Sequence, residues 1–303
     1  MNTFSSHLQN IDKKEGFRTV KKIICAVLLS GLLTPSLLLA ESSGFYGGSH
    51  RYAQVNRKWS IQPVGWNSEL NGHFKIVENK DPARGQIINL KRDTANLDKE
   101  NAFGLNCSYK VCHRGSIEVN AIQTEHDGNF RFARIFKGKN YAANSKFNIK
   151  NSIYDILFNY HLWHLVYNSG IEKYYVAGLL GVKATDSSFS IKGPIIGAQP
   201  QSIYTEYSEV LPTPYVGLEY GTFLGKLFYL KAGVRYMGLD VKDYEGSHYD
   251  YNATLSYRIS GDDCLHDVLM DLGYRYIEYD IEGKGNDIDL TYKGPYIAFD
   301  VLF

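Results

Sequence analysis

The sequence predicts an all-β chain that folds as a transmembrane antiparallel up-and-down β-barrel of about ten strands, with twelve as the alternative. Three features lead to this prediction: a hydrophobic segment near the N-terminus, a series of segments in which apolar and polar residues alternate, and an alternating segment that ends at Phe303. The composition agrees, because Tyr occurs 24 times and Phe 15 times, whereas Pro occurs only 8 times and Met 3 times. Aromatic residues favour strands.

Residues 1–40 are expected to form a cleaved signal peptide. Lys21 and Lys22 precede an apolar run from Ile23 to Ala40, which is the order of a secretory leader. A single membrane-spanning helix is the alternative, but the run barely reaches the roughly 20 apolar residues that a span needs. Pro35 lies inside the run and disfavours a continuous helix.

The alternation is clearest from Tyr249 to Ile259, where every second residue is apolar and the residues between them are polar. Side chains of a strand point to opposite faces in turn, and about 9–11 residues suffice for a tilted strand to cross the hydrocarbon layer. This segment and similar ones predict strands near 288–303, 265–281, 247–259, 226–241, 207–221, 172–186, 148–162, 115–130 and 102–111, with one more at Gly44 to Ala53.

The barrel is expected to occupy residues 41–303, with 54–100 as its uncertain part. This segment is interpreted as a long loop, as a plug in the lumen, or as an extra hairpin that would raise the strand count to twelve. Membrane barrels alternate short turns with long outer loops. We expect short turns at Thr222 to Gly225 and Ser260 to Cys264, and outer loops at Arg131 to Phe147 and Ser187 to Tyr204.

A soluble β-sandwich or lipocalin-like barrel is the alternative fold, because its strands alternate as well. The apolar faces favour the membrane, since tyrosine recurs at their ends, as in the aromatic girdles of membrane barrels. These tyrosines are Tyr154, Tyr160, Tyr236, Tyr249, Tyr257 and Tyr276.

The last segment places Ile297, Phe299, Val301 and Phe303 on one face. This ending resembles the C-terminal strand of bacterial outer-membrane barrels, whose terminal phenylalanine is read by the barrel-assembly machinery. The resemblance implies a location in the outer membrane of a Gram-negative bacterium. It also implies membrane lipid, lipopolysaccharide and the assembly machinery as partners.

Further motifs resemble, in their order, a family of proteobacterial outer-membrane β-barrel proteins without an assigned activity, and the likeness is strongest from about Glu206 to Phe303. It implies fold and location and carries over no catalytic residue. The motifs are Asn89-Leu90-Lys91-Arg92-Asp93, Leu97-Asp98-Lys99-Glu100-Asn101, Tyr249-Asp250-Tyr251, Gly273-Tyr274-Arg275 and Gly294-Pro295-Tyr296-Ile297.

If the apolar faces contact lipid, the opposite faces line the lumen, where charges of opposite sign fall on neighbouring strands. A lone charge in a narrow lumen is costly, whereas a paired one is tolerated, so we expect a salt-bridged, water-poor interior. Ten strands also enclose too little space for a wide pore. The predicted lumen network consists of Asp155, Glu219, Lys231, Arg235, Asp250, Arg258, Asp271, Arg275 and Asp300.

The histidines show little sign of catalytic or metal-binding spacing. His248 with Ser247 and Asp250, and His126 with Asp127 and Glu125, are interpreted as polar residues of outer loops, and His161 and His164 as belt residues beside Trp163. His50 and His113 have no partner at metal-ligand spacing. No catalytic residue, cofactor or metal is expected.

The chain beyond the leader keeps Cys107, Cys112 and Cys264. Export to an oxidising compartment permits a disulfide, and a turn from Ser108 to Val111 would bring Cys107 and Cys112 together. The spacing leaves open whether they form a disulfide or remain thiols.

The net charge is close to zero, since 33 basic residues face 32 acidic ones, which argues against nucleic acid as a partner. We expect a monomeric barrel with a structural, surface-interaction or narrow-channel role. The alternatives are an outer-membrane enzyme of the protease, phospholipase or lipid A-modifying type, and a small-solute diffusion channel.

Overall fold

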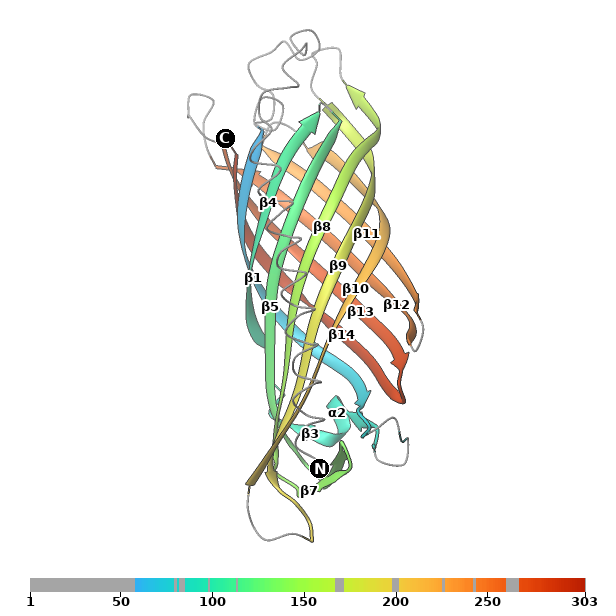
Figure 1. Ribbon diagram of the computed structural model, residues 1–303. Helices are drawn as coiled ribbons and strands as arrows, with labels where there is room; N and C mark the ends of the chain where they lie inside the picture. Colours follow the sequence, from blue (N-terminus) through green and yellow to red (C-terminus); the bar gives the residue numbers. More distant parts are fainter. Residues whose placement is uncertain are drawn as a thin grey trace. The chain divides into compact units, whose positions relative to one another are not determined.

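The computed structural model describes residues 58–78, 81, 85–97, 99–112, 114–166, 172–197, 202–224, 227–241, 244–259 and 267–302. In this part of the chain, ten long antiparallel strands form a ring (Figure 1). They are β1 (Trp59–Lys75), β4 (Glu100–Cys112), β5 (Gly115–Phe130), β8 (Lys146–Val166), β9 (Glu172–Pro194), β10 (Ser202–Leu224), β11 (Phe228–Val241), β12 (Tyr244–Arg258), β13 (Asp267–Gly283) and β14 (Asn286–Leu302).

The ring closes between β1 and β14, which pair from Ser60↔Leu302 to Lys75↔Asp287. The prediction of an antiparallel barrel of about ten strands is therefore confirmed. Nine strands lie near their predicted positions. The tenth does not, because β1 comes from the segment 54–100 that we expected to be a loop, plug or hairpin. The strand predicted at Gly44 to Ala53, like the proposed signal peptide, lies outside the described residues.

Short elements at one end of the ring complete the architecture. β2 (Ile88–Asn89) pairs with β1 and β3 (Thr94–Ala95) pairs with β5, with the single helical turn α2 (Leu90–Asp93) between them. The side chain of Asn89 caps this turn by accepting a hydrogen bond from the Arg92 N–H. A small hairpin, β6 (Arg134–Phe136) with β7 (Lys139–Tyr141), lies between β5 and β8 in the sequence.

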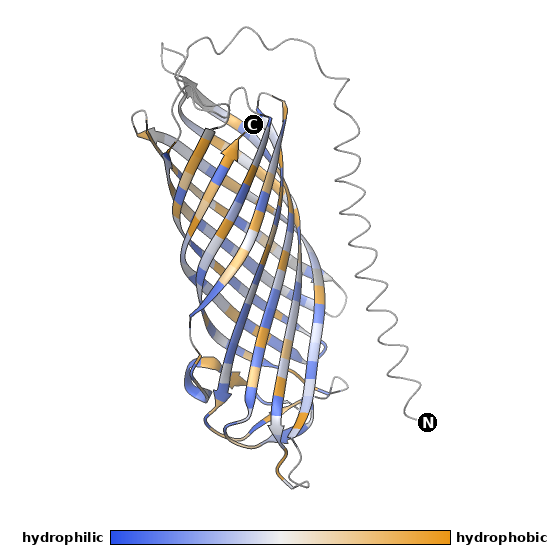
Figure 2. Cartoon of the chain, turned by 90° about the vertical axis from the view of Figure 1, so that its left-hand side faces the viewer, coloured by the Kyte–Doolittle hydropathy of each residue, from blue (hydrophilic) through white to orange (hydrophobic). Residues whose placement is uncertain are grey.

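Most of the long strands change their outward chemistry along their length. On β5, Ile117 points outward with apolar neighbours two and four residues on, and then Gln123, Glu125 and Asp127 follow on the same face. We call the half with the apolar outer surface the belt half and the half with the polar outer surface the cap half. Figure 2 shows hydrophobic and hydrophilic residues alternating along the strands.

The outer surface of the belt half is almost continuously apolar. Exposed residues on it include Phe103, Phe158, Leu180, Val182, Val216, Leu218, Leu230, Leu255, Leu272, Ile297 and Phe299. Water would disfavour so large an apolar band on a soluble protein, whereas lipid accommodates it. Tyr236 and Tyr251 lie near the boundary with the cap half, and Tyr160 and Tyr257 near the opposite margin.

The cap half has the opposite arrangement, with apolar side chains inside. Its core combines inward residues of the long strands with residues of the short elements. The fully buried members include Phe74, Ile88, Leu90, Phe130, Phe136, Tyr141, Phe147, Ile149, Phe189, Leu290 and Tyr292. The described part of the chain contains no helix long and apolar enough to span a membrane.

The connections at the cap end are shorter than predicted. Ser187 to Tyr204 was expected to be an outer loop, but β9 runs to Pro194 and β10 starts at Ser202. Arg131 to Phe147 contains the β6–β7 hairpin and the start of β8. The predicted strands ended where the outward face stops being apolar. Beyond that point the strands continue with polar residues facing outward and apolar residues facing inward.

Candidate functional site

The lumen of the belt half contains a dense cluster of buried charges. Asp250 of β12 accepts from Lys183 Nζ at 2.9 Å and from Arg275 Nη2 at 2.7 Å, and Arg235 Nη1 lies 3.8 Å away. Arg235 also donates to Asp155 at 3.1 Å. Both carboxylates and Lys183 are almost inaccessible to solvent. The strand alternation places all five on the inner face, and a barrel of this diameter brings opposite walls within reach.

A tyrosine and a histidine complete this cluster. The Tyr215 hydroxyl donates to Asp155 at 2.6 Å, and its ring lies under the Lys183 ammonium at 5.6 Å. His248 Nε2 lies 3.4 Å from Lys183 Nζ, and its ring stacks on Tyr279. His248 is thus a lumen residue. Its interpretation as an outer-loop residue is wrong, because it shares the strand face of Asp250 two residues away.

A second polar layer lies nearer the belt end. Glu219 accepts from the Tyr175 hydroxyl at 2.7 Å and from Asn159 Nδ2 at 3.4 Å. Asp271 accepts from Gln62 Nε2 at 2.7 Å. Together with Lys231 and residues of the first cluster, Glu219 and Asp271 line a cavity of about 80 Å³. Such a space holds a few water molecules rather than a large solute.

The predicted lumen network is only partly brought together. Asp155, Arg235, Asp250 and Arg275 form one ion-pair cluster, and Glu219, Lys231 and Asp271 line the adjoining cavity. Arg258, the last residue of β12, and Asp300 of β14 are half-buried at the belt ends of these strands. They do not belong to the cluster around Asp250.

Sequence reasoning missed Lys183 and Gln62. Lys183 has a signal, since it alternates with exposed Leu180 and Val182 on a predicted strand and must therefore point inward. Gln62 had no usable signal, because the segment that contains it was not recognised as a strand. The contact between Gln62 and Asp271 depends on β1 closing the ring.

The structure also places His126 apart from Glu125 and Asp127, its predicted neighbours in the second histidine cluster. His126 is fully buried on the inner face of β5, and its Nε2 lies 3.1 Å from Ser68 Oγ of β1. Glu125 and Asp127 point to the outer surface, where both accept from Asn148. The expectation that these three residues share an outer loop is wrong, because adjacent strand residues face opposite sides.

The remaining histidines do not come together in a site in the part of the chain that the structure describes. His161 stacks on Tyr175 at a centroid distance of 4.2 Å, and His164 follows on the same strand, β8. His50, His113 and Cys264 lie outside the described residues. No group of three His, Cys, Asp or Glu side chains suited to a metal ion occurs in the described part of the chain.

Cys107 and Cys112 are both free thiols. The turn that would have joined them does not exist, because β4 runs through Ser108 to Val111 as a strand. Five residues along a strand span roughly 17 Å, which far exceeds the distance that a disulfide bridges. In the C-terminal segment that resembles outer-membrane barrels, Ile297 and Phe299 are exposed on the belt and Val301 is half-exposed. Phe303 lies outside the described residues.

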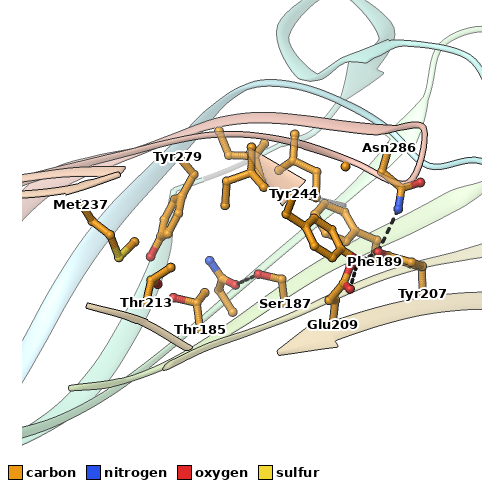
Figure 3. Close-up of a pocket in the computed structure, with 15 residues that line it drawn as sticks. Thr185, Ser187, Phe189, Tyr207, Glu209, Thr213, Met237, Tyr244, Tyr279 and Asn286 are labelled. Atoms are coloured by element: carbon orange, nitrogen blue, oxygen red, sulfur yellow. Dashed lines mark hydrogen bonds between the residues drawn. The ribbon is translucent and has the colours of Figure 1, made fainter. Parts of the chain in front are cut away.

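An apolar pocket lies on the cap side of the charged cluster (Figure 3). Met237, Phe189, Tyr279, Ile281 and Ile288 supply apolar walls. Its other lining residues are mainly polar, namely Asn151, Thr185, Ser187, Tyr207, Glu209, Thr213, Tyr244 and Asn286. Phe189, Tyr279 and Leu290 of its lining also belong to the apolar core of the cap half.

No protein-family model matches the sequence, and no curated protein sequence matches it. Solved structures do match. The outer membrane protease OmpT from Escherichia coli has a TM-score of 0.54 at 11% identity, over 81% of this chain and 97% of that chain.

OprG from Pseudomonas aeruginosa matches with a TM-score of 0.34 at 13% identity, over 80% of this chain and 95% of that chain. Ail of Yersinia pestis matches with 0.29 at 10% identity, over 81% and 98%. These two scores are too low to support an argument.

The ring of strands, the apolar belt and the likeness to OmpT define the chain as an outer-membrane β-barrel. The fold alone does not fix the activity of the protein.

Proposed function

We propose that this protein is a non-conducting outer-membrane barrel whose cap half projects from the cell surface as a rigid platform for surface interactions. The observation that carries the proposal is the apolar core of the cap half, in which Phe74, Phe130 and Phe189 are almost inaccessible to solvent. An ion cannot cross such a core without losing its hydration.

The charged cluster supports the same conclusion. Two carboxylates, Asp155 and Asp250, form ion pairs across the lumen with Lys183, Arg235 and Arg275. These ion pairs lie in the belt half, next to the apolar core of the cap half. A permeating ion would have to displace these pairs, and breaking a buried pair is costly. The lumen is therefore obstructed twice, by charge in the belt half and by apolar packing in the cap half.

The outer surface of the cap half supports the interaction role. Acidic side chains gather on β13 and β14, namely Glu278, Asp280, Glu282, Asp287 and Asp289. The lysines of β8 and β9 are mixed with acidic neighbours, since Glu125 of β5 pairs in register with Lys150. The acidic surface of β13 and β14 can therefore orient an approaching partner.

Planar-bilayer recording of the refolded full chain tests the proposal. Folding is first verified by a shift in gel migration between unheated and boiled samples. We expect no stable conductance steps from the folded protein. Reproducible unitary steps from preparations with full heat-modifiable migration would overturn the proposal and favour a diffusion channel.

An outer-membrane hydrolase is the second candidate, and one contact favours it. Ser68 Oγ lies 3.1 Å from His126 Nε2, which is the distance between a serine nucleophile and its base. Both residues are fully buried, so a substrate would need the cap to open. A fluorophosphonate probe discriminates: labelling that is lost in Ser68→Ala supports the hydrolase, and absence of labelling supports the platform.

A further inference from the structure

The charges around the polar cavity in the lumen of the belt half do not balance. The ion-pair cluster around Asp250 joins two carboxylates to three basic groups. The adjoining cavity adds the carboxylates of Glu118, Glu219 and Asp271, and Lys231 is the basic group whose charge acts on all three. When all these groups are ionised, five carboxylates face four basic groups. One negative charge is therefore in excess in this part of the lumen.

Hydrogen-bond donors are unevenly distributed among the carboxylates of the cavity. Asn159 Nδ2 lies 3.4 Å from a carboxylate oxygen of both Glu118 and Glu219. Asp271 accepts from Gln62 through one oxygen, Oδ2, at 2.7 Å. Its other oxygen, Oδ1, is buried and has no hydrogen-bond partner among the described residues. Asp271 is only 4% exposed, so bulk water does not solvate this oxygen.

A second buried oxygen without a donor belongs to the same wall of the cavity. Asn106 of β4 pairs in register with Gln62 of β1 and donates to its Oε1 at 3.2 Å. In the described part of the chain, Asn106 Oδ1 has no hydrogen-bond partner. Gln62 thus contacts Asn106 on one side and Asp271 on the other, and all three line the cavity. The closure of the ring by β1 brings these oxygens to one place.

Water and a cation differ in what they do for these two oxygens. Water molecules would donate a hydrogen bond to each oxygen but would leave the excess charge uncompensated in a lumen enclosed by lipid, where an unpaired charge is costly. A cation contacts the oxygens and compensates the charge at the same time. Carboxylate and amide oxygens are ligands that replace the hydration shell of hard cations. One excess charge corresponds to one monovalent ion.

We propose that the cavity binds one small monovalent cation, such as Na⁺, through Asp271 Oδ1 and Asn106 Oδ1, with water completing its coordination. The cavity of about 80 Å³ has room for the ion and several water molecules. The ion lies on the belt side of the ion-pair cluster and stabilises the fold without crossing the barrel. The proposal is independent of the platform role, because it uses only the lumen of the belt half.

The dependence of stability on the cation tests the proposal. The full chain is refolded in detergent with NaCl or with N-methyl-D-glucamine chloride at the same ionic strength, and heat-modifiable migration gives the midpoint of unfolding. A ligand that binds only the folded state stabilises it, so we expect a midpoint about 3 °C higher in Na⁺. Asp271→Asn keeps the shape of the side chain and should abolish the difference. Asp280→Asn, on the exposed face of the same strand, should retain it.

Lys231 provides a variant with the opposite effect. Its ammonium group repels a cation in the cavity, so Lys231→Gln should lower the Na⁺ concentration for the half-maximal effect by about threefold. A purely structural role of Lys231 would lower stability equally in both salts and would leave this concentration unchanged. If Asp271→Asn does not fold, Asn106→Leu removes the other oxygen and leaves the charge of the cavity unchanged. It should also weaken the response to Na⁺.

A heavier ion locates the site directly. Crystals of the full chain grown in Rb⁺ should show an anomalous scattering peak in the cavity beside Asp271, and this peak should be absent in Asp271→Asn. Rb⁺ peaks confined to the outer surface would indicate an adventitious ion only and would overturn the proposal. Equal midpoints of the wild type in the two salts, or an Asp271→Asn variant that keeps the full response to Na⁺, would also contradict it and would favour water in the cavity.

Discussion

Asp250 lies at the centre of the ion-pair cluster in the lumen. Lys183 and Arg275 both donate to it, and Arg235 lies within 4 Å of it. Asp250 is 3% exposed, so water cannot take the place of its carboxylate as the partner of these basic groups. Removing one partner of a buried ion pair leaves the other charge uncompensated, which is more costly than replacing the whole pair.

We therefore expect Asp250→Asn to lower the free energy of unfolding by about 3–5 kcal/mol. The measurement is urea unfolding of the protein in vesicles, followed by heat-modifiable migration. Asp240→Asn is the matched control, since Asp240 is exposed on β11 and its loss should change stability by less than about 0.5 kcal/mol. Equal effects of the two variants would contradict the assigned role of the cluster.

Asp93 has a comparable role in the cap half, outside the membrane. Its carboxylate binds Arg92 at 2.7 Å, Arg134 at 2.5 Å and the Asn89 N–H at 2.9 Å. Burial opposes ionisation of this group, but the hydrogen bonds from Arg92 and Arg134 hold its pKa well below its usual value. A carboxyl of this kind stabilises the fold above the pKa of its unfolded form, about 4, and loses that contribution as the pH falls.

Asp93→Asn should detach α2 from β6 and expose the cap to protease at pH 7, while the barrel stays folded. The loss is expected to be about 1–3 kcal/mol of local stability. Limited proteolysis with a trypsin time course measures it. Below about pH 4 the wild type should approach the variant, in assays with an acid-stable protease. Asp127→Asn, at an exposed site on β5, should match the wild type at pH 7.

At the scale of elements, the seam between β1 and β14 decides whether the ring closes. A Cβ at Gly294 would overlap the carbonyl oxygen of Asn67 on β1. The Gly294 carbonyl oxygen also accepts from the Trp66 indole at 3.1 Å. At Gly65, in contrast, the nearest atom to an added Cβ is a side-chain methyl of Ile297 at 3.7 Å. The same seam thus contains one intolerant and one tolerant glycine.

Gly294→Ala should destabilise the barrel by about 1–3 kcal/mol through overpacking, whereas Gly65→Ala should have little effect. The fraction that resists unfolding in detergent at increasing temperature measures both. A barrel that tolerates alanine at both positions would show that the seam is looser than the register indicates.

The extended strand ends were not predicted, and β8 shows why. Outward Phe158 and Tyr160 mark its belt half, while outward Lys146 and Lys150 mark its cap half. The period of two is unbroken, but the apolar face moves from outside to inside. A search for a continuous apolar face therefore ends at the middle of the strand. The predicted outer loops began where the environment of the strand changes from lipid to water.

At the scale of the whole molecule, the two halves place exposed lysines on one side of the membrane. Lys146 and Lys192 are register neighbours on the outer surface of the cap half. Lys183, in contrast, is sealed in the lumen. If the cap half projects from the cell, a membrane-impermeant amine reagent reaches the first two residues in intact cells.

We expect such a reagent to modify Lys146 and Lys192 in intact cells and to leave Lys183 unmodified until the protein is denatured. Quantitative mass spectrometry of the modified peptides gives the measurement. Modification of Lys146 only after the outer membrane is permeabilised would place the cap half in the periplasm and would reverse the proposed orientation.

The class of fold, the approximate positions of nine strands and the alternation of faces in their belt halves could be predicted from the sequence, because a period of two is a local property of an extended chain. It predicted Asp155, Arg235, Asp250 and Arg275 as lumen residues for the same reason. The three-dimensional structure was needed to show which charges meet across the lumen, that β1 closes the ring, that Cys107 and Cys112 lie apart, and that the pairing of β10 with β11 ends at Val216 and Tyr236. These properties depend on the register between strands and on the diameter of the ring, and no local pattern specifies either.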